Sequence, residues 1–125
     1  MDLKNYELKN FFEGIESFSF VSQHHKYMNN HDYNNAVYLL KKIPFLDNGF
    51  VLLKEDEAIA SPISVVYYEF YDEVKTLKEK LEREKENLQC IIGKDFIPFG
   101  KAQHPHLWDY ADGVDTMKFL LTLIE

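Results

Sequence analysis

Segment 61–93 constrains the fold more than any other part of the chain, because it predicts a strand, a helix and a second strand. Its first part, Ser-Pro-Ile-Ser-Val-Val-Tyr-Tyr-Glu-Phe-Tyr, is rich in the β-branched and aromatic residues that favour strands. Its middle carries one narrow apolar stripe at helical spacing, formed by Val74, Leu77, Leu81 and Leu88. Its last part, Gln-Cys-Ile-Ile-Gly, is a second apolar run that ends at a glycine. This order predicts a right-handed βαβ unit with parallel strands, so we expect an α/β fold with flanking helices around a parallel βαβ core.

The helix of this unit is highly charged, but its charges largely cancel. Between Asp72 and Glu86 there are six acidic and five basic residues, so this segment does not explain the net charge of −7. A single narrow stripe over four turns fits a helix that lies on a sheet better than the alternative, a coiled coil.

Composition narrows the class of protein. A chain of 125 residues suits one domain or domain fragment over 1–125. Its net charge of −7, without a basic cluster, argues against nucleic-acid binding. The sequence has no apolar run long enough to span a membrane and no signal-peptide pattern at its start. Cys90 is its only cysteine, so no internal disulfide can form. We therefore expect a cytoplasmic location without a membrane span. The chain has more aromatic residues than a small core needs: ten Phe, eight Tyr and one Trp. This surplus indicates that some of them lie at an interface with another domain or subunit.

The first half of the chain predicts helices and turns around this unit. A helix should begin near Asn5, and residues 18–21 should form a short strand or extended link. The Asn-rich segment 24–35 indicates a loop or broken helix turns, because such side chains bond their own backbone. A helix over 33–42 should end before Pro44. The Asp-Asn-Gly sequence at 47–49 predicts a turn, and 50–53 a short strand.

The last predicted helix, 114–124, is almost wholly apolar, and Asp115 is placed to cap it. A helix of this composition must be buried in the chain or against a partner. The segment before it, 101–113, is polar and should be a loop.

Three groups of side chains are candidates for chemistry, each with a structural alternative. The five histidines (His24, His25, His31, His104 and His106) lack a metal-site spacing such as HExxH, so we favour surface or hydrogen-bonding roles over a metal site. Cys90 lies in the second predicted strand, where a cysteine is usually a small buried hydrophobe rather than a nucleophile. The acidic residues at 55–57 can bond ribose hydroxyls at a strand end, but a solvated loop is the stronger interpretation.

The most distinctive polar patch is 108–116, where three carboxylates lie close to a glycine and a lone tryptophan. Asp109, Asp112 and Asp115 can bind ligand hydroxyls, or they can serve as turn and helix caps. The sequence alone favours the structural role slightly.

Five motifs follow one another between residues 47 and 116: Asp-Asn-Gly-Phe-Val-Leu-Leu-Lys-Glu at 47–55, Ala-Ser-Pro-Ile-Ser-Val at 60–65, Leu-Gln-Cys-Ile-Ile at 88–92, Ile-Pro-Phe-Gly-Lys-Ala-Gln at 97–103 and Leu-Trp-Asp-Tyr-Ala-Asp-Gly-Val-Asp-Thr at 107–116. In this order they resemble the C-terminal end of the bacterial acyl-CoA reductases of bioluminescence operons, a branch of the aldehyde dehydrogenase superfamily. The last motif is the most specific.

The resemblance implies a function and a set of site residues. The family reduces a fatty acyl-CoA or acyl-protein thioester to an aldehyde with NADPH or NADH, through an acyl-enzyme on a cysteine. That nucleophile and the dinucleotide-binding domain correspond to regions upstream of this chain. This chain itself would hold no catalytic residue and would be inactive alone. The loops around Ser61 and Pro62 would face the cofactor, and Trp108, Asp109, Asp112 and Asp115 would face the substrate.

Pro62 matches the proline of the superfamily's Glu-x-x-Gly-Pro motif, whereas Ser61 replaces its glycine. The position of the glutamate holds Ala58, so its ribose-binding role does not carry over. The exposed apolar surface of such a portion should make it a homo-oligomer. The alternatives are a stand-alone interaction module without chemistry and, more weakly, a metal-dependent enzyme that uses the histidines.

Overall fold

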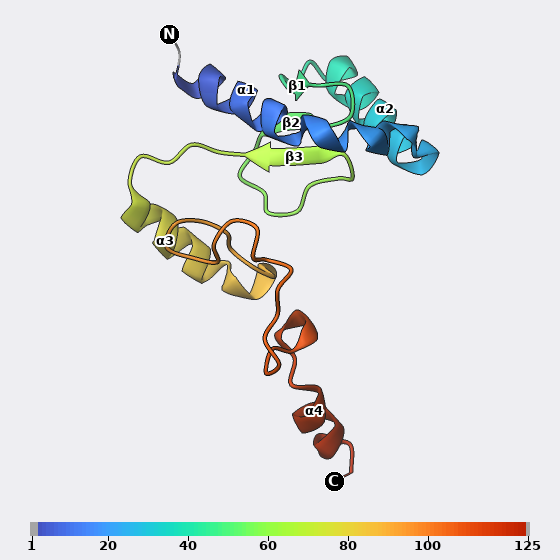
Figure 1. Cartoon of the computed structure of the whole chain (residues 1–125). Coiled ribbons are helices and arrows are strands. Elements are labelled where there is room, and N and C mark those ends of the chain that lie inside the picture. Colours follow the sequence, from blue (N-terminus) through green and yellow to red (C-terminus); the bar gives the residue numbers. More distant parts are fainter. Residues whose placement is uncertain (1–2, 125) are drawn as a thin grey trace. The chain divides into compact units, whose positions relative to one another are not determined.

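The computed structural model describes residues 3–124, apart from the side chains of residues 3–6 and 112. The chain divides into two compact units, one up to Phe70 (unit 1) and one from Tyr71 onward (unit 2). The three-stranded sheet lies in unit 1, and unit 2 consists of helices and loops among its described residues (Figure 1). The prediction of one domain or domain fragment over 1–125 stays a prediction.

Three consecutive helical elements open unit 1. They are α1 (Leu3–Ile15), the 3-10 helix η1 (Glu16–Gln23) and α2 (His25–Leu40). The first helix is confirmed, but it begins before Asn5, which lies inside it rather than at its start. The strand or extended link predicted at 18–21 is wrong, because these residues form η1.

Helix α2 begins well before the position that the sequence predicts. The expected loop over 24–35 is wrong, since the helix runs from His25 to Leu40 and so ends before Pro44. His24 caps its start by accepting a hydrogen bond at Nδ1 from the amide N–H of Tyr27, at 3.3 Å. The segment is helical because its buried polar side chains have hydrogen-bond partners elsewhere in unit 1. A search for periodic apolar residues in the sequence does not detect such a helix.

The sheet has the order β1-β2-β3. Strand β1 (Leu46–Asp47) pairs antiparallel with β2 (Leu52–Glu55), and β2 pairs parallel with β3 (Val65–Tyr68). The predicted turn between the first two strands is confirmed: Gly49 has a φ of +95°, and the side-chain oxygen of Asn48 accepts from the amide of Val51 at 2.9 Å.

The predicted βαβ unit over 65–92 is wrong in its second half. Residues 89–92 form no strand; Ile92 makes only an isolated bridge to Ile97. The parallel pair is instead β2 with β3, joined by the helix-free segment 56–64. A short apolar run becomes a strand only where a sheet edge is free to pair with it. The structure therefore mixes helices with a small sheet and is compatible with an α/β class.

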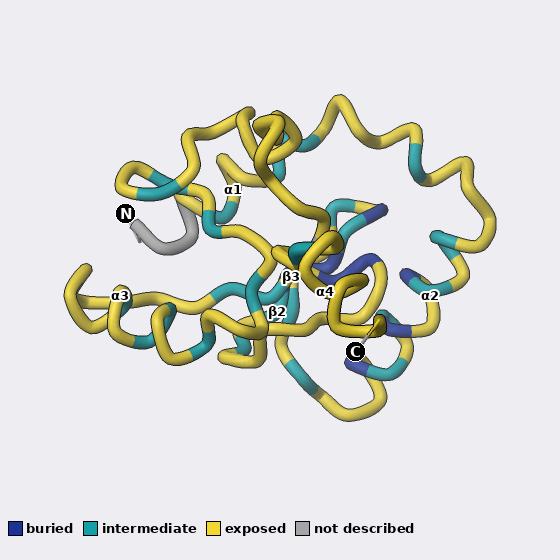
Figure 2. Tube along the Cα trace, turned by 90° about the horizontal axis from the view of Figure 1, so that it is seen from below, coloured by how far each residue is buried: buried dark blue, intermediate teal, exposed yellow. Residues whose placement is uncertain are grey.

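The core of unit 1 lies between α2 and the sheet. Tyr38, Leu52 and Val65 form its buried cluster, with half-buried Val37, Ile43, Phe45 and Tyr67 packed against them. Leu52 and Leu53 are the two fully buried large side chains among the described residues. In Figure 2 the buried positions gather on α2 and around β2 and β3.

Unit 2 contains α3 (Val74–Arg83), the 3-10 turns η2 (Lys85–Asn87) and η3 (Ala111–Gly113), and α4 (Thr116–Thr122). The charged helix is thus confirmed, with Leu77 and Leu81 half-buried on its apolar stripe. The last helix is confirmed too, but none of its described side chains is buried. The large apolar side chains exposed at this end are Met117, Phe119, Leu120, Leu121, Leu123 and Ile124. None of the described helices is long and apolar enough to cross a membrane.

Candidate functional site

One face of α2 is polar and buried or half-buried, and it attaches the helix to the rest of unit 1. This polar face consists of Tyr27, His31, Asn34 and Tyr38, which lie four, three and four residues apart. The Tyr27 hydroxyl donates to the carbonyl of Phe50 at 2.8 Å, and Asn34 Nδ2 donates to the carbonyl of Ile63 at 3.1 Å. Successive helix turns therefore hold the turn before β2 and the loop before β3 in place.

His31 is the most buried of the described titratable groups on this face, with a side chain only 6% exposed. Its Nε2 lies 3.0 Å from Asp47 Oδ1, and its Nδ1 lies 3.2 Å from Asp32 Oδ1. Asp47 also accepts from the amide of Gly49 at 2.7 Å and from Asn35 Nδ2 at 2.9 Å. The imidazole thus joins α2 to the turn after β1.

Two carboxylates face this ring, one at each nitrogen. An ionised carboxylate only accepts hydrogen bonds, so these two contacts favour the imidazolium, which carries a proton on both nitrogens. Burial by itself lowers the pKa of His31, but the hydrogen bonds to Asp47 and Asp32 and their negative charges raise the pKa above its ordinary value of 6.5.

A second polar cluster lies at the carboxyl end of β2. The ammonium of Lys54 bonds to the Asp56 carboxylate and lies 4.9 Å from the ring centre of Tyr67 and 5.8 Å from that of Tyr38. The bond from Lys54, with that from the amide of Ala58, lowers the pKa of Asp56. Burial, together with a hydrogen bond with Tyr67, raises the pKa of Tyr38 to about 12.

Ligands of open α/β sheets usually bind at the carboxyl ends of parallel strands, where Glu55, Asp56 and Tyr68 lie. Asp56 is already engaged by Lys54 and by the amide of Ala58, so it serves the structure. The interpretation of 55–57 as a solvated acidic loop is confirmed for exposed Glu57. It is wrong for Glu55, which is exposed but ends β2, and for half-buried Asp56.

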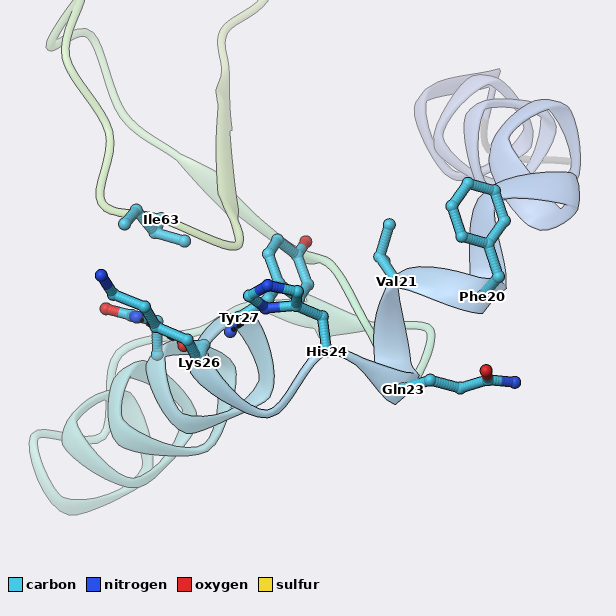
Figure 3. A pocket seen from close by; sticks show the side chains of 8 residues that line it. Phe20, Val21, Gln23, His24, Lys26, Tyr27 and Ile63 are labelled. Carbon is cyan, nitrogen blue, oxygen red and sulfur yellow. Dashed lines mark hydrogen bonds between the residues drawn. The ribbon is translucent and has the colours of Figure 1, made fainter.

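Unit 1 also holds an apolar groove of about 630 Å³. Figure 3 shows the rings of His24 and Tyr27 between Ile63 and Val21, with the side chain of Lys26 extending toward Ile63. Phe20 closes the η1 side, and Gln23 and Asn30 complete the lining. The groove is mostly apolar and has one ammonium at its rim, so its chemistry suits binding rather than catalysis.

Ser61 and Pro62 lie just before β3, at the amino end of the parallel pair. The Ser61 hydroxyl donates to the carbonyl of Val65 at 2.6 Å, and the Val65 amide donates to the carbonyl of Pro62 at 3.1 Å. Ser64 between them is buried and adopts a φ of +70°. These contacts make a tight loop whose outer residues, Ser61 and Pro62, stay exposed.

The residues expected to face substrate are spread along a loop of unit 2. Trp108 is exposed and stacks on His106 with ring centres 4.8 Å apart. Asp109 accepts from the amide of His106 at 2.7 Å, and Asp115 caps α4 by accepting from the amide of Lys118 at 2.9 Å. The Asp112 side chain lies outside the described part. Asp109 therefore closes a turn and Asp115 caps a helix, so the two carboxylates bond to different backbone groups.

Cys90 departs from its expected environment. It is exposed rather than buried, because the strand predicted around it does not form. It lines a hollow of about 1040 Å³ between the η2 segment and Phe96 within unit 2. Among the residues that the structure describes, no group of three histidines, cysteines or acids is placed to hold a metal ion.

The α2 polar face and the groove were both missed by sequence reasoning. The signal for the first was present: an aromatic or polar residue at 27, 31, 34 and 38 follows a helical period. The groove depends on Ile63, which comes from a distant loop, so no local pattern could have indicated it.

Comparison of the chain with models of known protein families, with curated proteins and with solved structures finds no match. Function must therefore be argued from the motifs and the geometry.

Proposed function

We propose that the chain is the C-terminal portion of the catalytic domain of a nicotinamide-dependent acyl-CoA reductase, with an aldehyde dehydrogenase-like fold in the complete enzyme. The observation that carries this proposal is the ordered series of five motifs, above all the one at 107–116. The parallel pairing of β2 and β3, with Ser61 and Pro62 leading into β3, is compatible with it.

The proposed reaction has two steps. A cysteine thiolate upstream of this chain attacks the carbonyl carbon of the acyl thioester and expels the CoA thiolate. NADPH or NADH would supply the hydride that reduces the acyl-enzyme to an aldehyde and frees the enzyme thiolate. Hydrogen-bond donors around the carbonyl oxygen stabilise the negative charge that develops on it.

This chain would supply binding surfaces rather than reacting groups. The tight loop at Ser61 and Pro62 would face the cofactor. Trp108, which is exposed, would supply an apolar face to the substrate, and Asp109, Asp112 and Asp115 would accept from its hydroxyls. Asp109 and Asp115 also act as caps, and each cap uses one carboxylate oxygen and leaves a second for a ligand.

Trapping the acyl-enzyme tests the assignment of the nucleophile. The complete gene product is incubated with a fatty acyl-CoA without NADPH or NADH, digested and examined by mass spectrometry. We expect the acyl adduct on a cysteine upstream of this chain, in the wild type and in Cys90→Ser alike. An adduct on Cys90 would contradict the proposal.

A homo-oligomeric state is part of the same proposal. The exposed apolar side chains of 117–124 support it, since so many large apolar groups rarely face water in a monomer. Light scattering of the purified chain at high concentration should show a dimer or larger species, and a monodisperse monomer would count against this part.

The alternative function is a stand-alone interaction module, and the exposed apolar side chains of α4 favour it equally. The gene sequence upstream of Met1 separates the two. An open frame that encodes a cysteine shortly before this chain, and a nucleotide-binding domain earlier, supports the reductase. A start codon at Met1 with a ribosome-binding site supports the module.

A further inference from the structure

His31 stands out among the described residues because it is buried and both of its ring nitrogens lie within hydrogen-bond distance of a carboxylate. The charged groups that face its ring are Asp32 from α2 and Asp47 from β1, and the neutral amide of Asn35 and the N–H of Gly49 bond to Asp47. Hydrogen bonds between charged partners are stronger than neutral ones, so the bonds from His31 and Asn35 to Asp47 help to attach α2 to β1.

The two carboxylates differ in how firmly they are held. Asp47 is fixed by two further donors, and its side chain is 28% exposed. Asp32 has a side chain that is 75% exposed, so it can turn toward water. When the ring loses one proton, the nitrogen that lost it can only accept a hydrogen bond, and it then repels the carboxylate oxygen that faces it. Asp32 is the exposed carboxylate, so it is the one that is free to move away.

We propose that His31 is a pH-sensitive clasp: as an imidazolium it bonds to both Asp32 and Asp47, and on losing the Nδ1 proton it releases Asp32 and keeps only a neutral hydrogen bond to Asp47, which weakens the attachment of α2 to the end of β1. This inference rests on the geometry of unit 1 alone and does not depend on the proposed function. A histidine is the side chain suited to such a change near neutral pH.

The direction of the pH effect follows from the raised pKa of His31. Because the folded state binds the proton more tightly than the unfolded chain, the clasp contributes its full stability below the ordinary pKa of 6.5. This contribution falls as the pH rises through the higher pKa of the folded protein.

NMR of the ring nitrogens in the whole chain tests the clasp directly. Below the ordinary pKa we expect protons on both nitrogens of His31, and a titration midpoint above that value. Asp32→Asn, which changes an exposed side chain, should lower the midpoint. The amide signals of Asp32 and Gly49 should shift with the same midpoint. A midpoint at or below the ordinary value, or one that Asp32→Asn leaves unchanged, would overturn the proposal.

Thermal unfolding supplies a second readout with a matched control. Between about pH 6 and pH 8.5, the range in which histidines titrate, the wild type should lose Tm. His31→Gln should remove most of this loss, whereas His25→Gln, at an exposed position, should retain it. Equal losses in both variants would contradict the clasp. If His31→Gln does not fold, the titration of wild type and Asp32→Asn still decides the question.

Discussion

At the residue scale, the turn before β2 depends on the backbone freedom of Gly49. Its φ is +95°, and an added Cβ would meet nothing within 4 Å, so only backbone strain opposes a side chain there. Gly14 provides a matched control, because it lies inside α1 and also has open space around it.

We therefore expect the same substitution to have opposite effects at these two glycines. Gly49→Ala should destabilise the chain by about 1–2 kcal/mol, the cost of a left-handed conformation for a residue with a Cβ. Gly14→Ala should stabilise it by about 0.5–1 kcal/mol through helix propensity. Urea unfolding measures both, and effects of equal sign would contradict the described turn.

Burial makes a comparable contrast between two leucines. Leu52 is fully buried in β2, while Leu40 at the end of α2 is 85% exposed. Leu52→Ala should cost about 2–5 kcal/mol because it leaves a cavity in the core. Leu40→Ala should change the free energy of unfolding by less than about 0.5 kcal/mol. A small effect at Leu52 in the same urea experiment would show that unit 1 lacks this core.

At the scale of elements, α2 is held by hydrogen bonds as well as by apolar packing. Tyr27 and Tyr33 lie on the same helix, but only Tyr27 reaches across unit 1, to the carbonyl of buried Phe50. Tyr33 is 69% exposed.

Removing one hydroxyl from each tyrosine isolates the contribution of that contact. Tyr27→Phe should destabilise the chain by about 1–2 kcal/mol, because the Phe50 carbonyl loses its partner, and Tyr33→Phe should be nearly neutral. Amide exchange around β2 should also accelerate in the first variant alone. Identical behaviour of the two variants would refute the fastening role of the α2 polar face.

The elements that were predictable from sequence are those governed by local chemistry. The turn at Gly49, the charged helix α3 and the Asp115 cap each follow from side chains close together in the chain. The start of α2 was missed because the helical period there is carried by polar side chains, and the burial of His31 and Asn34 depends on partners in distant turns. The strand predicted at 89–92 does not form for a related reason. An apolar run indicates that a segment favours strand pairing, but it does not show that a sheet edge is free to pair with that segment.

The binding roles of the candidate site residues stay a prediction. Ser61, Pro62 and Trp108, which the motifs indicate, all lie exposed in loops, where binding residues often occur. It did not separate the capping roles of Asp109 and Asp115 from a binding role, because one carboxylate can serve both.

For the whole molecule, the distribution of buried side chains separates the two units. The buried side chains of the described residues all belong to unit 1, and the large exposed apolar ones of 117–124 belong to unit 2. A portion of a larger catalyst that normally packs against further layers would show this contrast, and so would a module that binds a protein partner.

The acyl-CoA reduction assay decides between these accounts most directly. The complete gene product and this chain alone are each mixed with a fatty acyl-CoA and NADPH or NADH, and aldehyde formation and nicotinamide oxidation are followed together. Our account predicts turnover by the complete product and none by the chain alone. Turnover by the chain alone, or no reduction by a folded complete product, would contradict it.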